Sequence, residues 1–392
     1  MLSYTEAQHI IKSFAHSFGT EKVSLDDALG RVLAEKIIAD RDYPPFNRSA
    51  MDGYAIKAED FENDIKQFRI VDTIYAGGTT NKILSNGECY KIMTGAAVPL
   101  SADAVIRRED AEQKDFSVSF SINELRSFQN IAKKGEDLEA GSIVLEKPVK
   151  CNASVIGLLT SVGKYEVLVK KLPSVAIITT GNEVVDVCQP VTDVQIRNSN
   201  FYVLKALLKS WGILPSYHQH VLDDENEIHS AIKRVLQYDI VIINGGVSAG
   251  DADYVPSVLK KSGVEELFHK VAIRPGKPFW CGRKQNTMIF ALPGNPLSCL
   301  VTFTLFIRHY LENCFGISSS LLSLPIAAER KQRVKLDEFF PVQIKNEPSQ
   351  FHAIPFNGSG DIRLGHEAQA FALHPHAKPE LKAGEIIKSY ML

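Results

Sequence analysis

The sequence predicts a multidomain protein built around a doubly wound α/β domain. Three observations lead to this fold class. The chain has 392 residues, which is too long for a single ordinary core. Between residues 173 and 320, short apolar runs alternate with helix-like segments, as in a parallel sheet covered by helices. On either side, residues 48–140 and 321–392 carry short β-like runs and glycine-containing turns, which indicate an inserted β-rich domain and a C-terminal small β domain.

The N-terminal part is expected to be discontinuous. Residues 1–47 and 141–172 flank the β-rich insert, and we expect them to join in one elongated unit. Residues 5–18 have a helical pattern that stops at a glycine, and a second helical pattern covers residues 25–33. Another helix is expected around residues 154–161. The change of sequence texture at both ends of the insert is the reason for treating the insert as a separate domain.

The α/β part contains distinct strand and helix patterns. Residues 175–179 and 240–243 are continuous apolar runs, which are typical of strands buried on both faces of a parallel sheet. Asn198 is placed to cap a helix whose apolar face continues toward Gly212. Residues 225–236 form another helical pattern. This alternation predicts ligand binding at the carboxyl ends of the strands.

A strand-to-helix junction follows later in this domain. Residues 288–292 form an apolar strand pattern, and Pro296 suits the first residue of the helix expected at 297–311. That helix is apolar nearly all round and should be buried. Its N-terminus, with free N–H groups and the Ser298 hydroxyl, would suit an anion. A simple strand-to-helix turn explains the same pattern equally well.

Composition and charge exclude several functions. The formal net charge of −2 gives no overall basic field for nucleic acid, so any anion site must be built locally. No apolar run reaches the length of a membrane span, and the first residues lack a secretory signal pattern. The six cysteines contain no Cys-x-x-Cys pair and are expected to be reduced core residues. We therefore expect a cytoplasmic protein that binds neither nucleic acid nor a membrane.

One of the buried strands runs into a loop that holds Gly245, Gly246 and Gly250. Glycines let the backbone turn tightly and bring N–H groups close to an anion such as phosphate. Gly245 and Gly250 have the spacing of a Walker A loop, but Asp251 stands where that loop needs lysine, which argues against an ordinary NTPase. Asp251 and Asp253 instead offer oxygen ligands that suit Mg²⁺ held between the protein and a phosphorylated ligand. The alternative is a solvated βα turn with an acidic helix start.

Three basic residues follow this loop. If residues 268–274 are extended, Lys270 and Arg274 point to the same face. Pro275-Gly276 can then turn the chain and return Lys277 toward them, which would make a clamp for an oxyanion or phosphate. The alternative is an edge strand whose lysines only discourage aggregation.

Several short blocks occur along nearly the full length of the chain. They are Ala28-Leu-Gly-Arg-Val-Leu-Ala34, Pro44-Pro-Phe-Asn-Arg-Ser-Ala-Met-Asp-Gly-Tyr-Ala55, Ile92-Met-Thr-Gly-Ala96, Ala102-Asp-Ala-Val105, Gly135-Glu-Asp137, Thr180-Gly-Asn-Glu183, Asn198-Ser-Asn200, the glycine loop, Arg274-Pro-Gly-Lys-Pro278 and Leu292-Pro-Gly-Asn-Pro-Leu-Ser298. In this order, the blocks resemble the molybdopterin molybdenumtransferase family, which includes bacterial MoeA and the gephyrin E domain. Each block is short, but the ordered set is very specific.

The resemblance implies a MogA-like α/β domain and the insertion of molybdate into adenylylated molybdopterin. The implied reaction loses AMP in a Mg²⁺-dependent step and forms molybdenum cofactor. Cleavage of a phosphoanhydride needs charge neutralisation by metal and cations, and molybdate is itself a dianion. The resemblance also implies a homodimer whose active site spans two chains. The partners it implies are the upstream adenylyltransferase and molybdoenzyme acceptors.

The resemblance also implies a role for individual residues, each named by its number in this sequence. The resemblance assigns catalytic roles to Asp52, Thr94, Asp137, Glu183, Asp223 and Asp253. It assigns substrate binding to Gly245, Gly246, Ser248, Gly250, Lys270, Arg274, Lys277, Pro293, Gly294, Asn295, Ser298 and Ser359. The expected metal ligands are Asp251, Asp253 and Glu183.

Some positions depart from the family pattern. Asn47 and Asn182 stand where many relatives carry aspartate, and Arg274 stands where lysine is common. An arginine is expected shortly after Glu338-Phe339, where this chain reads Phe340-Pro341-Val342. A molybdate contact from the C-terminal domain is therefore in question. The candidates to replace it are Arg330, Arg333 and Arg363.

Other functions compete with this interpretation. A molybdopterin adenylyltransferase would act one step earlier, but such proteins lack the insert and the C-terminal domain. A gephyrin-like scaffold would call for a long disordered linker or a fused second domain, and this sequence has neither. A nucleotide-binding regulator that shares the α/β domain is a weaker third alternative.

Overall fold

The computed structural model describes residues 1–248, 253–318, 321–346 and 348–392. Gly250 and Asp251, which the sequence assigns to substrate and metal binding, lie outside the described residues. The described chain forms a larger and a smaller compact unit. The larger unit holds Met1–Ala34, Pro148–Ala153 and Glu166–Leu392, and the smaller unit holds Glu35–Lys147 and Ser154–Tyr165. The four predicted domain boundaries stay a prediction.

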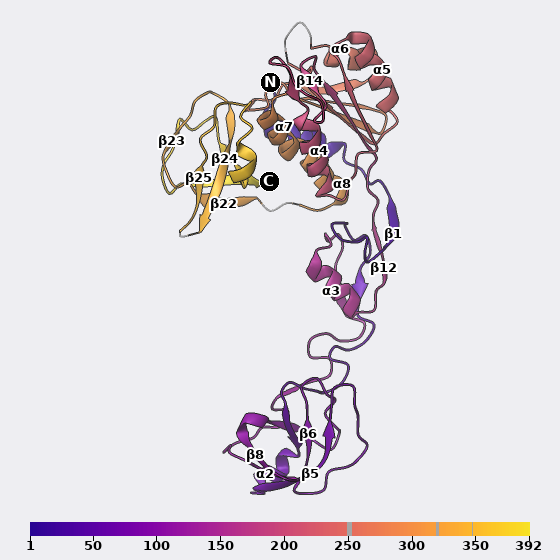
Figure 1. Cartoon of the computed structure of the whole chain (residues 1–392), viewed down its shortest axis with the longest axis vertical. Helices are drawn as coiled ribbons and strands as arrows, with labels where there is room; N and C mark the ends of the chain where they lie inside the picture. Colours follow the sequence, from indigo (N-terminus) through magenta and orange to yellow (C-terminus); the bar gives the residue numbers. More distant parts are fainter. Residues whose placement is uncertain (249–252, 319–320, 347) are drawn as a thin grey trace. The chain divides into compact units, whose positions relative to one another are not determined.

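The larger unit contains a sheet with the strand order β16-β13-β17-β21-β20-β18 (Figure 1). The first four strands run parallel, and β20 pairs antiparallel with both β21 and β18. The bounds are β16 Tyr217–Val221, β13 Val175–Thr180, β17 Ile240–Asn244, β21 Thr287–Leu292, β20 Trp280–Lys284 and β18 Glu265–His269. Both β13 and β17 are buried along their whole length, as their apolar sequences predict. The predicted doubly wound α/β domain is confirmed.

Helices cover both faces of this sheet (Figure 1). One face packs against α1 (Tyr4–Ser13), α4 (Ser199–Lys209), α7 (Pro296–Thr302), a π-helical segment (Phe303–Ile307) and α8 (Arg308–Phe315). The other face packs against α5 (Glu225–Val235) and α6 (Val255–Lys261). Strand side chains alternate accordingly: Ile177 and Ile242 face the first group, and Ile178 and Ile243 face the second.

The predicted helix ends in this domain agree with the structure. Asn198 is the N-cap of α4, and its side-chain oxygen accepts a hydrogen bond from the Phe201 N–H at 3.2 Å. Gly212 follows α4 with a φ of 76°, a left-handed conformation that suits glycine. Pro296 is the first residue of α7. The capping and glycine signals in the sequence were therefore sufficient to place these ends.

The N-terminal helices differ from the prediction. α1 ends at Ser13, earlier than the predicted residue 18, and β1 (Thr20–Ser24) pairs with β12 (Glu166–Lys170). The helix predicted at residues 25–33 is wrong, because that segment forms turns. Gly30 has a φ of 78° in the middle of it, and its N–H donates to the Cys151 carbonyl at 2.8 Å. Backbone pairing with a distant segment replaces the helical hydrogen bonds that the local pattern suggested.

A β-rich region follows the α/β domain within the larger unit. Its main sheet has the order β19-β24-β26-β28-β22, with β25 paired to β24, and a second pairing joins β23 to β27. The bounds are β19 Ile273–Arg274, β22 Leu322–Pro325, β23 Arg330–Lys331, β24 Asp337–Asn346, β25 Ser349–Ala353, β26 Ala370–His374, β27 Glu380–Leu381 and β28 Ile386–Met391, with the short helix α9 at Leu364–Glu367. β19 lies within the α/β part of the sequence but pairs with β24 in this sheet. The α/β domain and the C-terminal β region are therefore joined by this strand pairing.

The smaller unit is mainly β-structure. Its main sheet has the order β7-β4-β6-β5-β9-β8, with separate hydrophobic clusters that include Tyr90 and Phe68. The strands are β2 Ile37–Ile38, β3 Arg48–Ser49, β4 Gly53–Ile56, β5 Gln67–Ile74, β6 Glu88–Ile92, β7 Ala104–Arg107, β8 Ala111–Lys114, β9 Ser117–Phe120, β10 Ile131–Ala132 and β11 Ile143–Leu145. The helices are α2 Ala58–Glu62, a 3-10 turn at Arg108–Asp110, and α3 Ala153–Ser161, which belongs to this unit from Ser154 onward and matches the helix predicted at 154–161. Within the described parts of both units, no helix has the length and apolar character needed to cross a membrane.

Candidate active site at the carboxyl ends of the parallel strands

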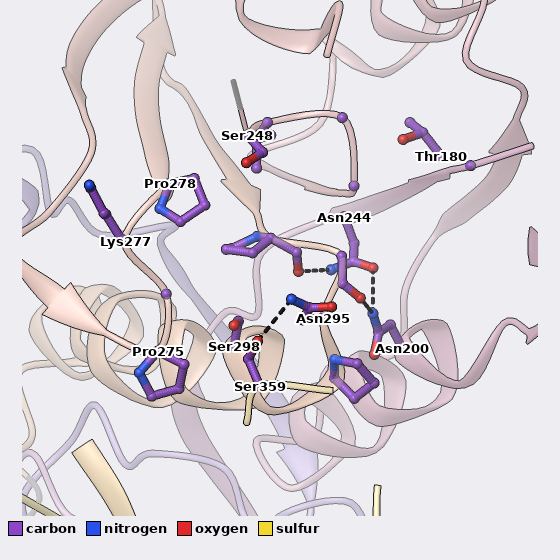
Figure 2. Close-up of a pocket in the computed structure, with 18 of the residues that line it drawn as sticks. Thr180, Asn200, Asn244, Ser248, Pro275, Lys277, Pro278, Asn295, Ser298 and Ser359 are labelled. Carbon is purple, nitrogen blue, oxygen red and sulfur yellow. Dashed lines mark hydrogen bonds between the residues drawn. The ribbon is translucent and has the colours of Figure 1, made fainter. Parts of the chain in front are cut away.

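A cavity of ≈ 1110 Å³ lies where β13, β17 and β21 end. This position agrees with the rule that doubly wound sheets bind ligands at the carboxyl ends of their strands. The predicted site residues that line it are Glu183, Asp223, Gly245, Gly246, Ser248, Asp253, Arg274, Lys277, Pro293, Gly294, Asn295, Ser298 and Ser359. Residues scattered over nearly half of the chain therefore meet at one cavity (Figure 2).

The start of the glycine loop is tightly constrained. Gly245 has a φ of 104°, and a Cβ placed there would lie 2.6 Å from Thr180 Oγ1 and 2.8 Å from the Thr180 carbonyl oxygen. The Gly245 N–H donates to the Leu292 carbonyl oxygen at 3.0 Å. That N–H is therefore not available to an anion, unlike the open set of donors that the sequence suggested.

Two buried asparagines tie the strand-end loops together (Figure 2). Asn200 Nδ2, at the start of α4, donates to Asn244 Oδ1 at 2.8 Å and to the Gly294 carbonyl at 2.6 Å. Asn244 Nδ2, at the end of β17, donates to the Pro293 carbonyl at 2.9 Å. We call this network the asparagine clamp. It fixes the Pro293-Gly294 turn against β17 and α4.

The basic wall of the cavity differs from the prediction. Residues 268–274 are not one extended strand: β18 ends at His269, Lys270 has a φ of 69°, and β19 begins at Ile273 in the other sheet. The predicted shared face of Lys270 and Arg274 is therefore wrong. Arg274 and Lys277 line the cavity, whereas Lys270 does not line it as far as the described residues define it. The predicted turn does return the chain, since the Val271 N–H donates to the Lys277 carbonyl at 2.9 Å.

The acidic residues of the cavity are suited in kind to a hard metal ion. Carboxylates of Glu183, Asp223 and Asp253 line it, and carboxylate oxygens are the ligands that Mg²⁺ prefers. Asn182 Oδ1 accepts the Asp223 N–H at 3.0 Å, so this neutral residue positions the aspartate backbone. Within the part of the chain that the structure describes, no cluster of three or more His, Cys, Asp or Glu is arranged to hold a metal.

The C-terminal β region contributes one wall. Ser359 Oγ accepts a hydrogen bond from Asn295 Nδ2 at 2.9 Å, and the Ser359 carbonyl accepts the Leu297 N–H at 3.1 Å (Figure 2). The N-terminus of α7 is therefore partly occupied by protein, which corrects the expectation of free N–H groups there. Ser298 is 4% exposed and also lines the cavity.

Sequence reasoning missed several lining residues. Thr180 appeared only in a family block, Asn200 appeared only in a family block and beside a helix cap, and Asn244 and Arg197 were given no role. The signal for Asn244 was available, because it is a polar residue that ends an otherwise apolar buried strand. Arg197 ends β15 (Ile196–Arg197), which pairs with β14 (Val184–Val185) beside the cavity.

Comparison with known proteins identifies the family. Residues 2–163 match the family model "MoeA N-terminal region (domain I and II)", and residues 176–313 match "Probable molybdopterin binding domain". The chain is 32% identical over 397 aligned residues to the molybdopterin molybdenumtransferase of Synechocystis sp., with 100% of both chains covered. The chain belongs to the molybdopterin molybdenumtransferase family.

Further relatives agree with this assignment. A molybdopterin molybdenumtransferase of Staphylococcus epidermidis is 34% identical, with 93% of this chain and 89% of the relative covered. A crystal structure of the MoeA molybdopterin biosynthesis protein of Pyrococcus horikoshii has a TM-score of 0.84 at 27% identity and covers 100% of both chains. A second structure from that organism has a TM-score of 0.78 at 30% identity and covers 100% of this chain and 99% of its own. The family fold therefore extends over the whole chain.

None of the three candidates for the expected C-terminal arginine is among the described residues that line the cavity. Arg330 Nη1 donates to Glu338 Oε2 at 2.8 Å and contacts His374 Nδ1 at 2.7 Å, and its guanidinium lies 4.0 Å from the Phe340 ring centroid. Burial lowers the pKa of the Arg330 guanidinium, and the hydrogen bond to Glu338 opposes that shift. Arg363 is paired with Asp361 at 2.7 Å. Among the described lining residues, neither of these arginines nor Arg333 appears.

Asp52 and Thr94 meet within the smaller unit. The Asp52 carboxylate accepts hydrogen bonds from the Thr94 N–H at 2.7 Å and from its hydroxyl at 2.8 Å. These bonds hold the pKa of the Asp52 carboxyl below its usual value, so it is ionised at neutral pH. Asp137 also belongs to this unit, where its N–H donates to the Tyr43 carbonyl at 3.1 Å. The structure thus brings together two of the three predicted residues of this unit.

Proposed function

We propose that this protein inserts molybdate into adenylylated molybdopterin, with Mg²⁺-dependent release of AMP, to form molybdenum cofactor. The observation that supports it most is the cavity at the strand ends. Most of its lining residues lie within the segment that matches the molybdopterin-binding family model, and it combines basic and acidic residues. The Synechocystis relative, named molybdopterin molybdenumtransferase, covers the full chain. The family membership and the cavity thus point to the same reaction.

The residues of the cavity suit the charges of this reaction. Arg274 and Lys277 would neutralise phosphate and molybdate oxygens, because charge-assisted hydrogen bonds to oxyanions are the strong ones. Glu183 and Asp253, with Asp251, would hold Mg²⁺ near the phosphoanhydride. When bound, Mg²⁺ would act as a Lewis acid on a phosphoryl oxygen. The asparagine clamp keeps the Pro293-Gly294 turn in place while the ligand binds.

Incubation of the pure protein with adenylylated molybdopterin, molybdate and Mg²⁺ tests this function. We expect stoichiometric release of AMP that requires molybdate and stops when Mg²⁺ is removed. An adenylyltransferase would instead consume ATP with molybdopterin, and a scaffold or regulator would turn over neither substrate. Absence of AMP release from a folded preparation would refute the proposal.

The variant Asp253→Asn tests the metal assignment. It keeps the side-chain size and removes one charge, so AMP release should fall by a large factor, on the order of 100-fold, while folding survives. The control is Asp26→Asn, the same change at an exposed aspartate of the larger unit that is not among the described residues lining the cavity. Titration of Mg²⁺ at limiting concentration provides the readout. Full activity of Asp253→Asn under those conditions would remove this residue from the metal site.

We further propose that the protein is a homodimer and acts in the cytoplasm. In the family that it resembles, the inserted domain of one subunit lies over the α/β cleft of the other. Asp52 and Thr94 would then act on a substrate held in the partner's cavity. Sedimentation at micromolar concentration should show a dimer in active preparations, and a monomer alone would contradict this. The upstream adenylyltransferase and molybdoenzyme acceptors are the proposed partners, and the free cysteines suit a reducing compartment.

A further inference from the structure

A third basic residue lines the cavity beside Arg274 and Lys277. Arg197 is the last residue of β15, and it is exposed where it lines the cavity. Among the described lining residues, these three are the basic ones. The function proposed above gives roles to Arg274 and Lys277 but none to Arg197. An exposed arginine on the wall of a cavity that receives anions is a candidate ligand contact.

The Arg197 guanidinium has no hydrogen-bond or ion-pair partner within the described part of the chain. Arg283, on β20 of the same domain, is different because it donates to Glu265 Oε2 at 2.7 Å. A guanidinium carries five N–H donors in a planar fork that matches the oxygens of a phosphate. In Arg197 this fork is not used by the surrounding protein and can serve a ligand.

The backbone around Arg197 is anchored on both sides. Before it, the Ile196 N–H donates to the Glu183 carbonyl at 2.8 Å. After it, the Asn198 N–H donates to the Val185 carbonyl at 2.9 Å, and Val185 is opposite Arg197 in the parallel pairing of β14 and β15. A side chain that extends from a fixed backbone loses less freedom when it binds a ligand. Arg197 is therefore well placed to hold an anion without a movement of the chain.

These hydrogen bonds also place Arg197 on the side of the cavity where β13 ends. Glu183 immediately precedes β14, and its carboxylate lies close to the end of β13, since a Cβ on Gly181 would lie 2.9 Å from Glu183 Oε2. Glu183 is one of the proposed Mg²⁺ ligands. Arg197 thus enters the cavity from the same short segment as a carboxylate that suits a metal ion.

The other two basic residues enter from a different part of the fold. Arg274 is in β19, which pairs with β24 of the C-terminal β region, and Lys277 follows three residues later. Figure 2 shows Lys277 on the opposite side of the cavity from Thr180, the last residue of β13. The basic residues of the cavity therefore form two groups, and each group can hold its own anion.

We propose that Arg197 binds the phosphoanhydride of adenylylated molybdopterin, while Arg274 and Lys277 bind molybdate. This inference rests on the function proposed above and divides the cavity into two anion subsites. The reaction brings together two separate anions, so two subsites fit its substrates. The phosphoanhydride is assigned to the Arg197 side because Mg²⁺ is commonly bound by protein carboxylates together with substrate phosphates, and Glu183 lies there.

The variant Arg197→Ala tests this assignment by binding measurements that need no turnover. With Mg²⁺ present, calorimetry should show about 10- to 100-fold weaker binding of adenylylated molybdopterin, because a charge-assisted contact is lost. Arg197→Lys keeps the charge but not the planar fork, so it should recover only part of the affinity. The molybdate concentration needed at saturating adenylylated molybdopterin should not change, in contrast to the effect expected for Lys277→Ala.

Arg234→Ala is the matched control. Arg234 is an exposed arginine in the last turn of α5 and is not among the described residues that line the cavity. Its replacement should leave both affinities unchanged. Thermal unfolding of Arg197→Ala should match the wild type, because the guanidinium forms no hydrogen bond or ion pair within the described residues. A clearly lower melting temperature would give Arg197 a structural role and overturn the inference.

Titration with AMP identifies which phosphate Arg197 contacts. If Arg197→Ala weakens binding of both AMP and adenylylated molybdopterin, the contact is to the nucleotide phosphate. If it weakens only adenylylated molybdopterin, the contact is to the phosphate of molybdopterin. A raised molybdate requirement with unchanged affinity for both ligands would place molybdate beside Arg197 and overturn the assignment, and no change in any of these quantities would remove Arg197 from the site. Failure of the wild type to bind adenylylated molybdopterin would instead refute the proposed function.

Discussion

Replacing Lys277 by Ala is expected to raise the molybdate concentration needed for cofactor formation by roughly 10- to 100-fold. Lys277 and Arg274 both line the cavity, and Figure 2 shows Lys277 on the side away from Asn200 and Thr180. A dianion needs converging donors, and a net charge of −2 offers no diffuse field to substitute for a missing one. Nucleotide affinity should fall less than the apparent affinity for molybdate.

Titration of molybdate at saturating adenylylated molybdopterin measures this effect. Lys233→Ala is the matched control, because Lys233 is exposed on α5, which packs on the other face of the sheet. An unchanged molybdate requirement in Lys277→Ala, combined with weaker nucleotide binding, would move Lys277 into the phosphate site. Arg274→Ala serves as the second member of the pair. If the two cations hold one anion together, their effects should not be additive.

The α/β domain could be predicted because its signals are local. The apolar run of β17, the Asn198 cap of α4 and the Pro296 start of α7 each act within a few residues of where they stand. Such features determine element type and position with little help from the rest of the chain. The position of the cavity could also be predicted, because doubly wound sheets bind their ligands at the carboxyl ends of the parallel strands.

The errors arise where distant segments decide local geometry. Residues 268–274 have a strand-like pattern, but β19 pairs with β24, which lies more than 60 residues further along the chain. β19 therefore belongs to a different sheet from β18, and Lys270 between them has a φ of 69°. Residues 25–33 likewise form turns because Gly30 bonds to Cys151. No local propensity records such a partner.

The asparagine clamp shows why part of the candidate site could not be predicted from the sequence. Asn200 and Asn244 are 44 residues apart, and Asn200 and Gly294 are 94 apart. Sequence reasoning gave the Asn198-Ser199-Asn200 block only the role of a helix cap, which Asn198 does fulfil. The function of Asn200 becomes visible only when three strand ends are brought together. Polar residues at the ends of buried strands are the signal that could have suggested it.

A substitution at the start of the glycine loop is expected to have a large effect on stability. Gly245→Ala should destabilise the larger unit by about 2–4 kcal/mol, because the new Cβ meets Thr180 Oγ1 at 2.6 Å and the Thr180 carbonyl oxygen at 2.8 Å. The residue must also keep a φ of 104°, which alanine rarely adopts. Neither contact can relax easily, since the Gly245 N–H is bonded to the Leu292 carbonyl and Thr180 ends a buried strand.

Gly294→Ala is the matched control for this prediction. Gly294 lines the same cavity, but the nearest atom to a Cβ there is the Gly245 Cα at 3.7 Å, which is an ordinary contact. Its φ is not in the left-handed region, so alanine should change stability by no more than about 0.5 kcal/mol and can even stabilise by restricting the unfolded chain. Thermal or urea unfolding of both variants measures the difference. Equal stability of Gly245→Ala and Gly294→Ala would show that the backbone at Gly245 can relax, and the loop would then not be the rigid element that its geometry indicates.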